Sequence, residues 1–115
     1  MDISMTPWLT LLVLIGAALL EAGGDALVRL GMDNSGRTLR FALMAAGAVV
    51  LFCYGYTVNA PRWQFGRLLG IYVPLLFVIA QVMAWVALRE KPSPAILIGG
   101  ALIVTGGAVI WLWAR

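Results

Sequence analysis

The chain has 115 residues, of which 63% are hydrophobic and 11% are charged. A soluble domain is close to half apolar and about a quarter charged, so a water-soluble fold of this size is excluded and an integral membrane protein is expected. The chain has no histidine and one cysteine, Cys53, which excludes a disulfide framework and a Cys/His metal site. The net charge of +3 comes from scattered basic residues, which are typical of the flanks of membrane spans and not of a nucleic-acid-binding patch.

Four apolar stretches follow one another along the chain, at about residues 7–30, 41–59, 68–88 and 95–113. Each is close to the roughly 20 residues that a helix needs to cross a bilayer, and a helix satisfies its own backbone hydrogen bonds in lipid. The connections are short, so neighbouring helices are expected to run antiparallel. The sequence therefore predicts an all-α fold in which residues 1–115 form a single domain of four short transmembrane helices.

Tryptophans and basic residues mark the ends of these stretches. An aromatic belt at the membrane interface is expected from Trp8, Trp63, Trp111 and Trp113. The side of the membrane that holds the termini has three basic residues and the other side has five, a difference too small to fix one orientation under the positive-inside rule. The distribution therefore permits insertion both ways round. The first group is Arg62, Arg67 and Arg115, and the second is Arg29, Arg37, Arg40, Arg89 and Lys91.

Glu21 lies well inside the first span, 14 residues after Pro7 and 9 before Leu30. A carboxyl group in hydrocarbon is costly, and such a residue is by default a functional candidate. Ala17 and Gly24, its neighbours on the helix surface, are small and leave room around it. Desolvation favours the neutral carboxyl, which could then exchange a proton for a cation. The alternative is a protonated glutamic acid that only forms hydrogen bonds across helices.

Asp25 and Arg29 continue the line of Glu21 at intervals of four residues, so the three share one stripe of the helix. This spacing permits an ion pair between Asp25 and Arg29. Alternatively, Asp25 extends an acidic vestibule from Glu21 toward water, and Arg29 reaches the membrane interface by itself.

The second and third spans contribute further polar candidates. Pro74 removes a backbone donor and should kink the third helix, either as a hinge for alternating access or as a static bend. Tyr72 offers a hydroxyl group and a ring face to a cation, and Tyr54 in the second span is a similar candidate. We therefore expect Glu21, Tyr72, Asp25 and Tyr54 to form a proton and substrate site.

Four short helices enclose little space, and a chain this small could build a gated cavity by pairing with a second copy of itself. The fourth span offers a surface for this pairing, because Gly99 and Gly106 are seven residues apart and share one helix face. Small residues let membrane helices approach closely. The expected interface lies either within the chain or between two chains.

These features resemble the small multidrug resistance transporters of the wider drug/metabolite transporter superfamily. Residues 21–29 are similar to the first helix of that family, which has its glutamate, a glycine three residues later and a basic residue eight residues later. Here these positions are Glu21, Gly24 and Arg29.

The fourth span matches the dimerisation pattern of that family, which is a glycine, two residues, Leu-Ile, two residues and a glycine. The matching residues are Gly99, Leu102, Ile103 and Gly106. The resemblance covers nearly the whole chain. It implies an antiparallel homodimer of dual topology, in which Glu21 of both protomers binds protons and a cationic substrate in turn. Tyr72 falls near the position of the family's third-helix tryptophan, and Pro74 falls where that helix has the glycines of its kink.

Three departures bear on the substrate. The third-helix tryptophan and Gly-x-Gly of the family are absent, Asp25 is an additional charge, and residues 61–72 look closer to YnfA-like relatives. An exporter of aromatic cations, of guanidinium or of YnfA-like substrates remains open, as does a subunit that flips a lipid-linked sugar.

The leading hypothesis is a proton-coupled exporter of small, partly apolar cations in the bacterial inner membrane. The first alternative is a flippase, or a heteromeric subunit of one, for a lipid-linked substrate. The second is a membrane accessory protein that transports nothing. The expected partners are a small cationic substrate, the lipid bilayer and a second copy of the chain, or a heteromeric partner. No cofactor besides the coupling proton, no metal, no nucleic acid and no enzymatic activity are expected.

Overall fold

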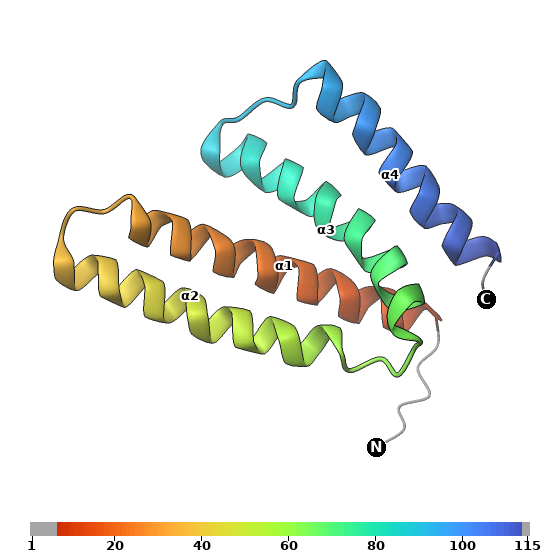
Figure 1. Ribbon diagram of the computed structural model, residues 1–115, viewed down its shortest axis with the longest axis horizontal. Coiled ribbons are helices and arrows are strands. Elements are labelled where there is room, and N and C mark those ends of the chain that lie inside the picture. Colours follow the sequence, from red (N-terminus) through yellow and green to blue (C-terminus); the bar gives the residue numbers. More distant parts are fainter. Residues whose placement is uncertain (1–6, 114–115) are drawn as a thin grey trace. The chain divides into compact units, whose positions relative to one another are not determined.

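The computed structural model describes residues 7–113, and the regular structure within that range is entirely helical (Figure 1). Its helices are α1 (Pro7–Met32), α2 (Arg37–Val58), α3 (Phe65–Leu88) and α4 (Pro94–Trp113). All four are long and apolar enough to cross a membrane, which confirms the predicted all-α membrane fold. Arg115, one of the basic residues weighed for orientation, lies outside the described residues.

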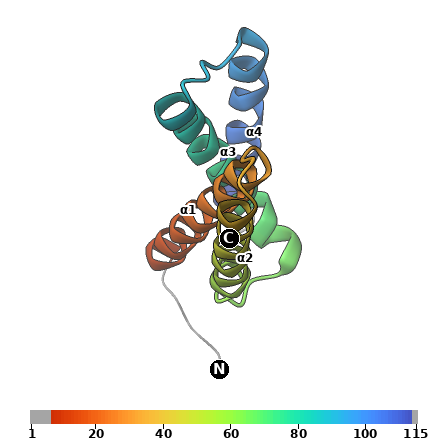
Figure 2. The same cartoon turned by 90° about the vertical axis from the view of Figure 1, so that its left-hand side faces the viewer.

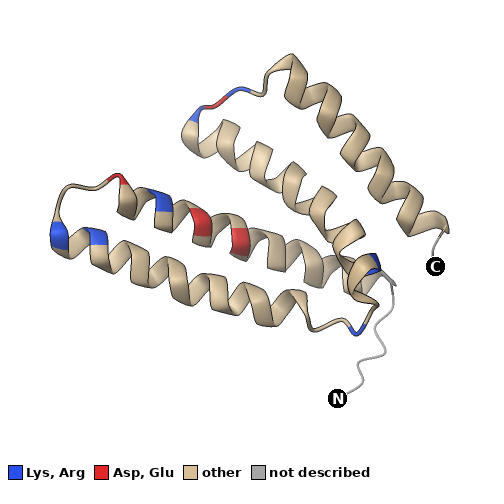
Figure 3. Cartoon of the chain, in the orientation of Figure 1, with Lys and Arg blue, Asp and Glu red and all other residues tan. Residues whose placement is uncertain are grey.

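The chain divides after Pro61 into two compact units, each of which is a hairpin of two helices (Figures 1 and 2). The first unit contains α1 and α2, and the second contains α3 and α4. Most of the charged residues lie near the helix ends and in the connections, while Glu21 and Asp25 lie within α1 (Figure 3). This distribution is the one expected of membrane spans, because charged groups avoid the hydrocarbon.

The turn of the first hairpin is short and held by its own hydrogen bonds. The backbone N–H of Asp33 donates to the carbonyl of Arg29 at 3.0 Å, and that of Gly36 donates to Oδ1 of Asn34 at 2.8 Å. The asparagine side chain thus replaces a backbone acceptor, as is common in tight turns. Helix α2 begins at Arg37, four residues before the start of the predicted span. The prediction began later because the first turn of the helix is polar and lies outside the apolar stretch.

Glycines allow α1 and α2 to pack closely. A Cβ atom added at Gly24 would lie 2.8 Å from the side chain of Leu51, and one added at Gly47 would lie 2.7 Å from that of Val28. A Cβ atom at Gly31 would similarly lie 2.7 Å from Cγ of Met44. Close approach through small residues is the usual way for membrane helices to gain packing contacts, since lipid provides no hydrophobic driving force between them.

The second hairpin has well-defined helix ends. Arg89 ends α3 in the left-handed conformation, with φ of 56°, and the N–H of Glu90 donates to the carbonyl of Ala84 at 2.9 Å. This hydrogen bond spans six residues and satisfies one of the carbonyl groups at the end of the helix. Ser93 precedes α4 and accepts a hydrogen bond at its Oγ from the N–H of Ile96 at 3.3 Å, while Pro94 is the first helical residue.

Pro74 lies inside α3 and packs against α4. A Cβ atom at Gly107 would lie 2.5 Å from Cγ of Pro74, and one at Gly100 would lie 2.7 Å from the ring of Phe77. Because proline has no N–H, the carbonyl of Gly70 loses its helical donor at position 74. The proline therefore sits directly at the α3–α4 contact, and its role as a hinge stays a prediction.

The α1–α2 packing predicts that Gly47→Ala destabilises the first hairpin, because the added methyl group would lie 2.9 Å from the carbonyl oxygen of Gly24, which cannot move aside as a side chain could. We expect a loss of about 1–3 kcal/mol in the free energy of unfolding, measured in detergent by titration with a denaturing detergent. Gly55→Ala in the same helix is the matched control, since a Cβ atom there meets nothing within 4 Å. Equal stability of the two variants would contradict the packing.

Candidate functional site

Glu21 lies near the middle of α1, half-buried in a line of small or buried residues. Leu14 and Ala17 are fully buried and precede it along this line, and Gly24 is buried and follows it. The intervals of four and three residues keep all four positions on one face of the helix. The carboxyl group therefore belongs to the face of α1 that packs, and not to a face exposed along its whole length.

The first hairpin brings a second predicted residue to Glu21. The contacts of Gly24 with Leu51 and of Gly47 with Val28 define an antiparallel register. One helical turn closer to the start of α1, the same register pairs Glu21 with Tyr54. Tyr54 is half-buried. A phenol opposite a carboxyl group can donate a hydrogen bond to it and can offer a ring face to a cation.

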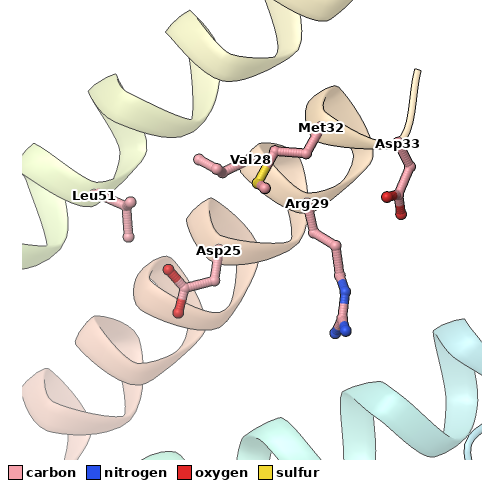
Figure 4. Close-up of a pocket in the computed structure, with 6 residues that line it drawn as sticks. All are labelled: Asp25, Val28, Arg29, Met32, Asp33 and Leu51. Atoms are coloured by element: carbon pink, nitrogen blue, oxygen red, sulfur yellow. The ribbon is translucent and has the colours of Figure 1, made fainter. Parts of the chain in front are cut away.

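Asp25 lines a cleft of about 510 Å³ at the end of α1 (Figure 4). Arg29 and Asp33 line the same cleft, together with apolar side chains of both helices. Asp33 was not among the predicted site residues, because it was interpreted as part of a loop. Its distance of four residues from Arg29 continues the stripe that begins at Glu21 and is the signal that identifies it.

The carboxylate of Asp25 and the guanidinium of Arg29, which both line this cleft, point in diverging directions (Figure 4). Both residues are exposed. The cleft therefore presents two carboxylates and one guanidinium separately, and it can attract an ion of either sign. Among the described residues, no group of three or more His, Cys, Asp or Glu side chains is placed to hold a metal ion.

Tyr72 and Pro74 belong to the second unit, on α3. Tyr72 is only 1% exposed, and Pro74 is buried against α4. The predicted site residues thus fall into two groups, with Glu21, Tyr54 and Asp25 on the first hairpin and Tyr72 on the second.

The predicted interface residues of α4 lie away from α3. A Cβ atom at Gly99 or Gly106 would meet nothing within 4 Å, and Leu102 is 71% exposed. Ile103 is half-buried. The packing against α3 uses the next glycines in the sequence, Gly100 and Gly107. One helix therefore has two glycine faces, of which one is occupied within the hairpin.

Trp63, Arg67 and Trp111 form a cluster in the second unit that the sequence did not reveal. The guanidinium carbon of Arg67 lies 4.3 Å from the centroid of the Trp63 ring. The rings of Trp63 and Trp111 are 6.2 Å apart between centroids and tilted by 41°. Both tryptophans are half-buried, so they do more than anchor helix ends in the interface.

Comparisons with known proteins identify relatives of the chain. No family model and no solved structure match it. A UPF0060 membrane protein of Herpetosiphon aurantiacus is 30% identical over 101 residues, which cover 86% of this chain and 89% of that protein. The UPF0060 membrane protein YfjF of Bacillus subtilis (strain 168) is 30% identical over 103 residues, which cover 89% and 92%. Four membrane-spanning helices and bacterial relatives along nearly its whole length make this a multi-pass bacterial membrane protein, and the chain belongs to the UPF0060 family of membrane proteins.

Proposed function

We propose that the protein is a proton-coupled exporter of small, partly apolar cations, related to the small multidrug resistance transporters and located in the bacterial inner membrane. The observation that carries this proposal is the half-buried Glu21 near the middle of a membrane-spanning helix, with Tyr54 opposite it in the register of the hairpin. An ionisable residue at this depth is costly and is retained for a function.

The carboxyl group of Glu21 alternates between two states in this proposal. When protonated it is neutral and tolerates hydrocarbon, and when it releases the proton it binds a cation in its place. The same oxygen atoms cannot hold both, so binding of one ligand expels the other. Ala17 and Gly24, on either side, are buried in the helix packing, and the Tyr54 ring opposite the carboxyl group supplies a surface for the cation.

The cleft at the end of α1 gives this site an approach from water. Asp25 and Asp33 raise the local concentration of cations there. In the second unit, Tyr72 contributes to the substrate site, and Pro74 provides the hinge of alternating access. Proline inside a membrane helix weakens the hydrogen-bond ladder and makes bending easier at that point.

A homodimer completes the transporter in this proposal. The face of Gly99, Leu102 and Gly106 is uncovered in the hairpin and fits the close approach of a second α4. The weak charge bias permits two chains of opposite orientation, and an antiparallel pair would hold two Glu21 carboxyl groups. Exchange of conformations between two identical chains then alternates the access.

A flippase for a lipid-linked substrate is the second candidate, and the position of Arg29 favours it. Its guanidinium lines the cleft and points away from Asp25, so it is able to attract a phosphate group (Figure 4). In a flippase, Arg29→Ala would reduce transport at least as much as Glu21→Gln. In an accessory protein that transports nothing, Glu21→Gln would be tolerated once folding is preserved.

The exporter predicts that cations release protons from the purified protein. We expect release when a lipophilic quaternary cation, guanidinium or a polyamine is added in detergent, and we expect Glu21→Gln to abolish it. Cation affinity should fall by about thirtyfold or more in this variant, because the bound cation would lose its carboxylate partner. Removing one partner of a buried charge pair costs about 2 kcal/mol or more. Cation affinity of the wild type should increase as the pH rises, since protons and cation compete for one carboxyl group.

Glu90→Gln is the matched control, because it makes the same chemical change at an exposed glutamate in the α3–α4 connection. It should leave proton release unchanged. No release by folded wild-type protein across the panel, or equal loss in both variants, would rule out Glu21 as the exchange site.

The uncovered glycine face predicts that Gly106→Leu weakens the dimer without unfolding the hairpin. A leucine side chain would hold a second helix away, whereas its Cβ atom would meet nothing within 4 Å in the part of the chain that the structure describes. The measurement is the molecular mass in detergent by light scattering, with circular dichroism as the test of folding. Ala108→Leu, at another exposed position of α4, is the control and should remain dimeric. A monomeric wild type, or a Gly106→Leu dimer of wild-type stability, would contradict this interface.

A further inference from the structure

The Trp63–Arg67–Trp111 cluster lies at one end of the second hairpin. Trp63 lies two residues before the start of α3, Arg67 lies in the first turn of α3, and Trp111 lies in the last turn of α4. The guanidinium stacks on Trp63 at 4.3 Å, and Trp111 packs beside Trp63 at 6.2 Å. The stacking holds the guanidinium at a fixed place between two membrane-spanning helices, where its N–H groups still need acceptors.

Acceptors for Arg67 are scarce within the hairpin. Its Nε atom is enclosed and has no hydrogen-bond partner among the described residues. The sequence from residue 62 onward contains one carboxylate side chain, Glu90, and it follows the opposite end of α3. Since α3 has 24 residues, about 36 Å separates its two ends. The positive charge of Arg67 is therefore not balanced by a carboxylate side chain of its own unit, and exposed Arg62 adds a second positive charge at the same end.

The depth of the cluster in the membrane indicates what supplies the missing acceptor. It lies at the ends of two spans, next to large apolar side chains that face outward, Phe65 at 68% exposure and Trp113 at 86%. Tryptophans at span ends lie at the level of the lipid headgroups. The polar group available to an arginine at that level is the lipid phosphate, whose oxygens accept two parallel N–H bonds from a guanidinium.

We infer that the Trp63–Arg67–Trp111 cluster binds the phosphate group of an anionic phospholipid. Trp63, supported by Trp111, fixes the guanidinium plane. Arg67 donates to the phosphate oxygens, and Arg62 adds attraction for a headgroup with net negative charge. This site consists of residues of the second unit alone, and the inference does not depend on the export activity.

Native mass spectrometry tests this inference. The full-length protein in detergent micelles receives equal amounts of phosphatidylglycerol and phosphatidylethanolamine, and the bound lipids are counted. We expect phosphatidylglycerol to be preferred. Arg67→Gln should lower its affinity by more than the roughly fivefold that the loss of any one surface charge causes, and Arg62→Gln should lower it by about that factor. Equal effects of both variants would show general surface charge and overturn the site.

Tryptophan variants test the platform without changing any charge. Trp63→Phe should weaken phosphatidylglycerol binding, because phenylalanine attracts a cation less strongly than tryptophan. Trp85→Phe, at an exposed tryptophan in the last turn of α3, should not weaken it. Circular dichroism establishes that each variant is folded. An unchanged affinity in folded Trp63→Phe would overturn the inference.

Inorganic phosphate separates the lipid from a soluble source of the same group. We expect millimolar phosphate to leave bound phosphatidylglycerol in place, because the acyl chains contribute to retention at the apolar rim. Displacement by phosphate at that concentration, with loss of displacement in Arg67→Gln, would assign the site to a free anion and overturn the assignment to lipid.

Discussion

The cost of a carboxyl group in hydrocarbon is the constraint on which the first unit depends. Glu21 occupies the packing face of α1, between Ala17 and Gly24, where larger side chains would fill its surroundings. The contact of Gly24 with α2 holds the hairpin together and also sets the register that places Tyr54 across from the carboxyl group. The helix packing and the geometry of the site therefore depend on the same contact, because a change at Gly24 would shift α2 and with it Tyr54.

The second unit uses its glycines in a different way. Gly100 and Gly107 receive Phe77 and Pro74 from α3, whereas a Cβ atom at Gly99 or Gly106 would meet nothing within 4 Å among the described residues. Adjacent helical positions point about 100° apart, so each pair forms a face of its own. A helix that packs against only one other helix gains no packing contacts from a second face of glycines. This duplication is the physical reason for expecting a further helix against α4, and it is independent of any sequence resemblance.

The four spans could be predicted from the sequence because hydropathy alone determines which stretches remain in lipid. Glu21 was evident for the same reason, as the charge that breaks the pattern. Asp33 was missed because it follows Met32, the last residue of α1, and lies in the connection, where no site residue was expected. The cluster around Arg67 was missed because residues 63 and 111 are far apart in the sequence, and their contact depends on how α3 and α4 fold back on each other.

The charged side chains of the two units favour opposite kinds of ligand. The first unit places Glu21, Asp25 and Asp33 along one helix and its end, a series that would draw cations inward from the cleft in the proposed exporter, whereas Arg29 in the same cleft would draw anions. The second unit has a stacked arginine at one end and its one carboxylate side chain beyond the other end of α3. A phosphate bound to Arg67 would neutralise a positive charge that a cationic substrate would otherwise meet at the membrane surface. An arginine that is neutralised by lipid could thus anchor its own hairpin at a fixed depth, and in the proposed exporter the carboxylates of the first unit would select the substrate.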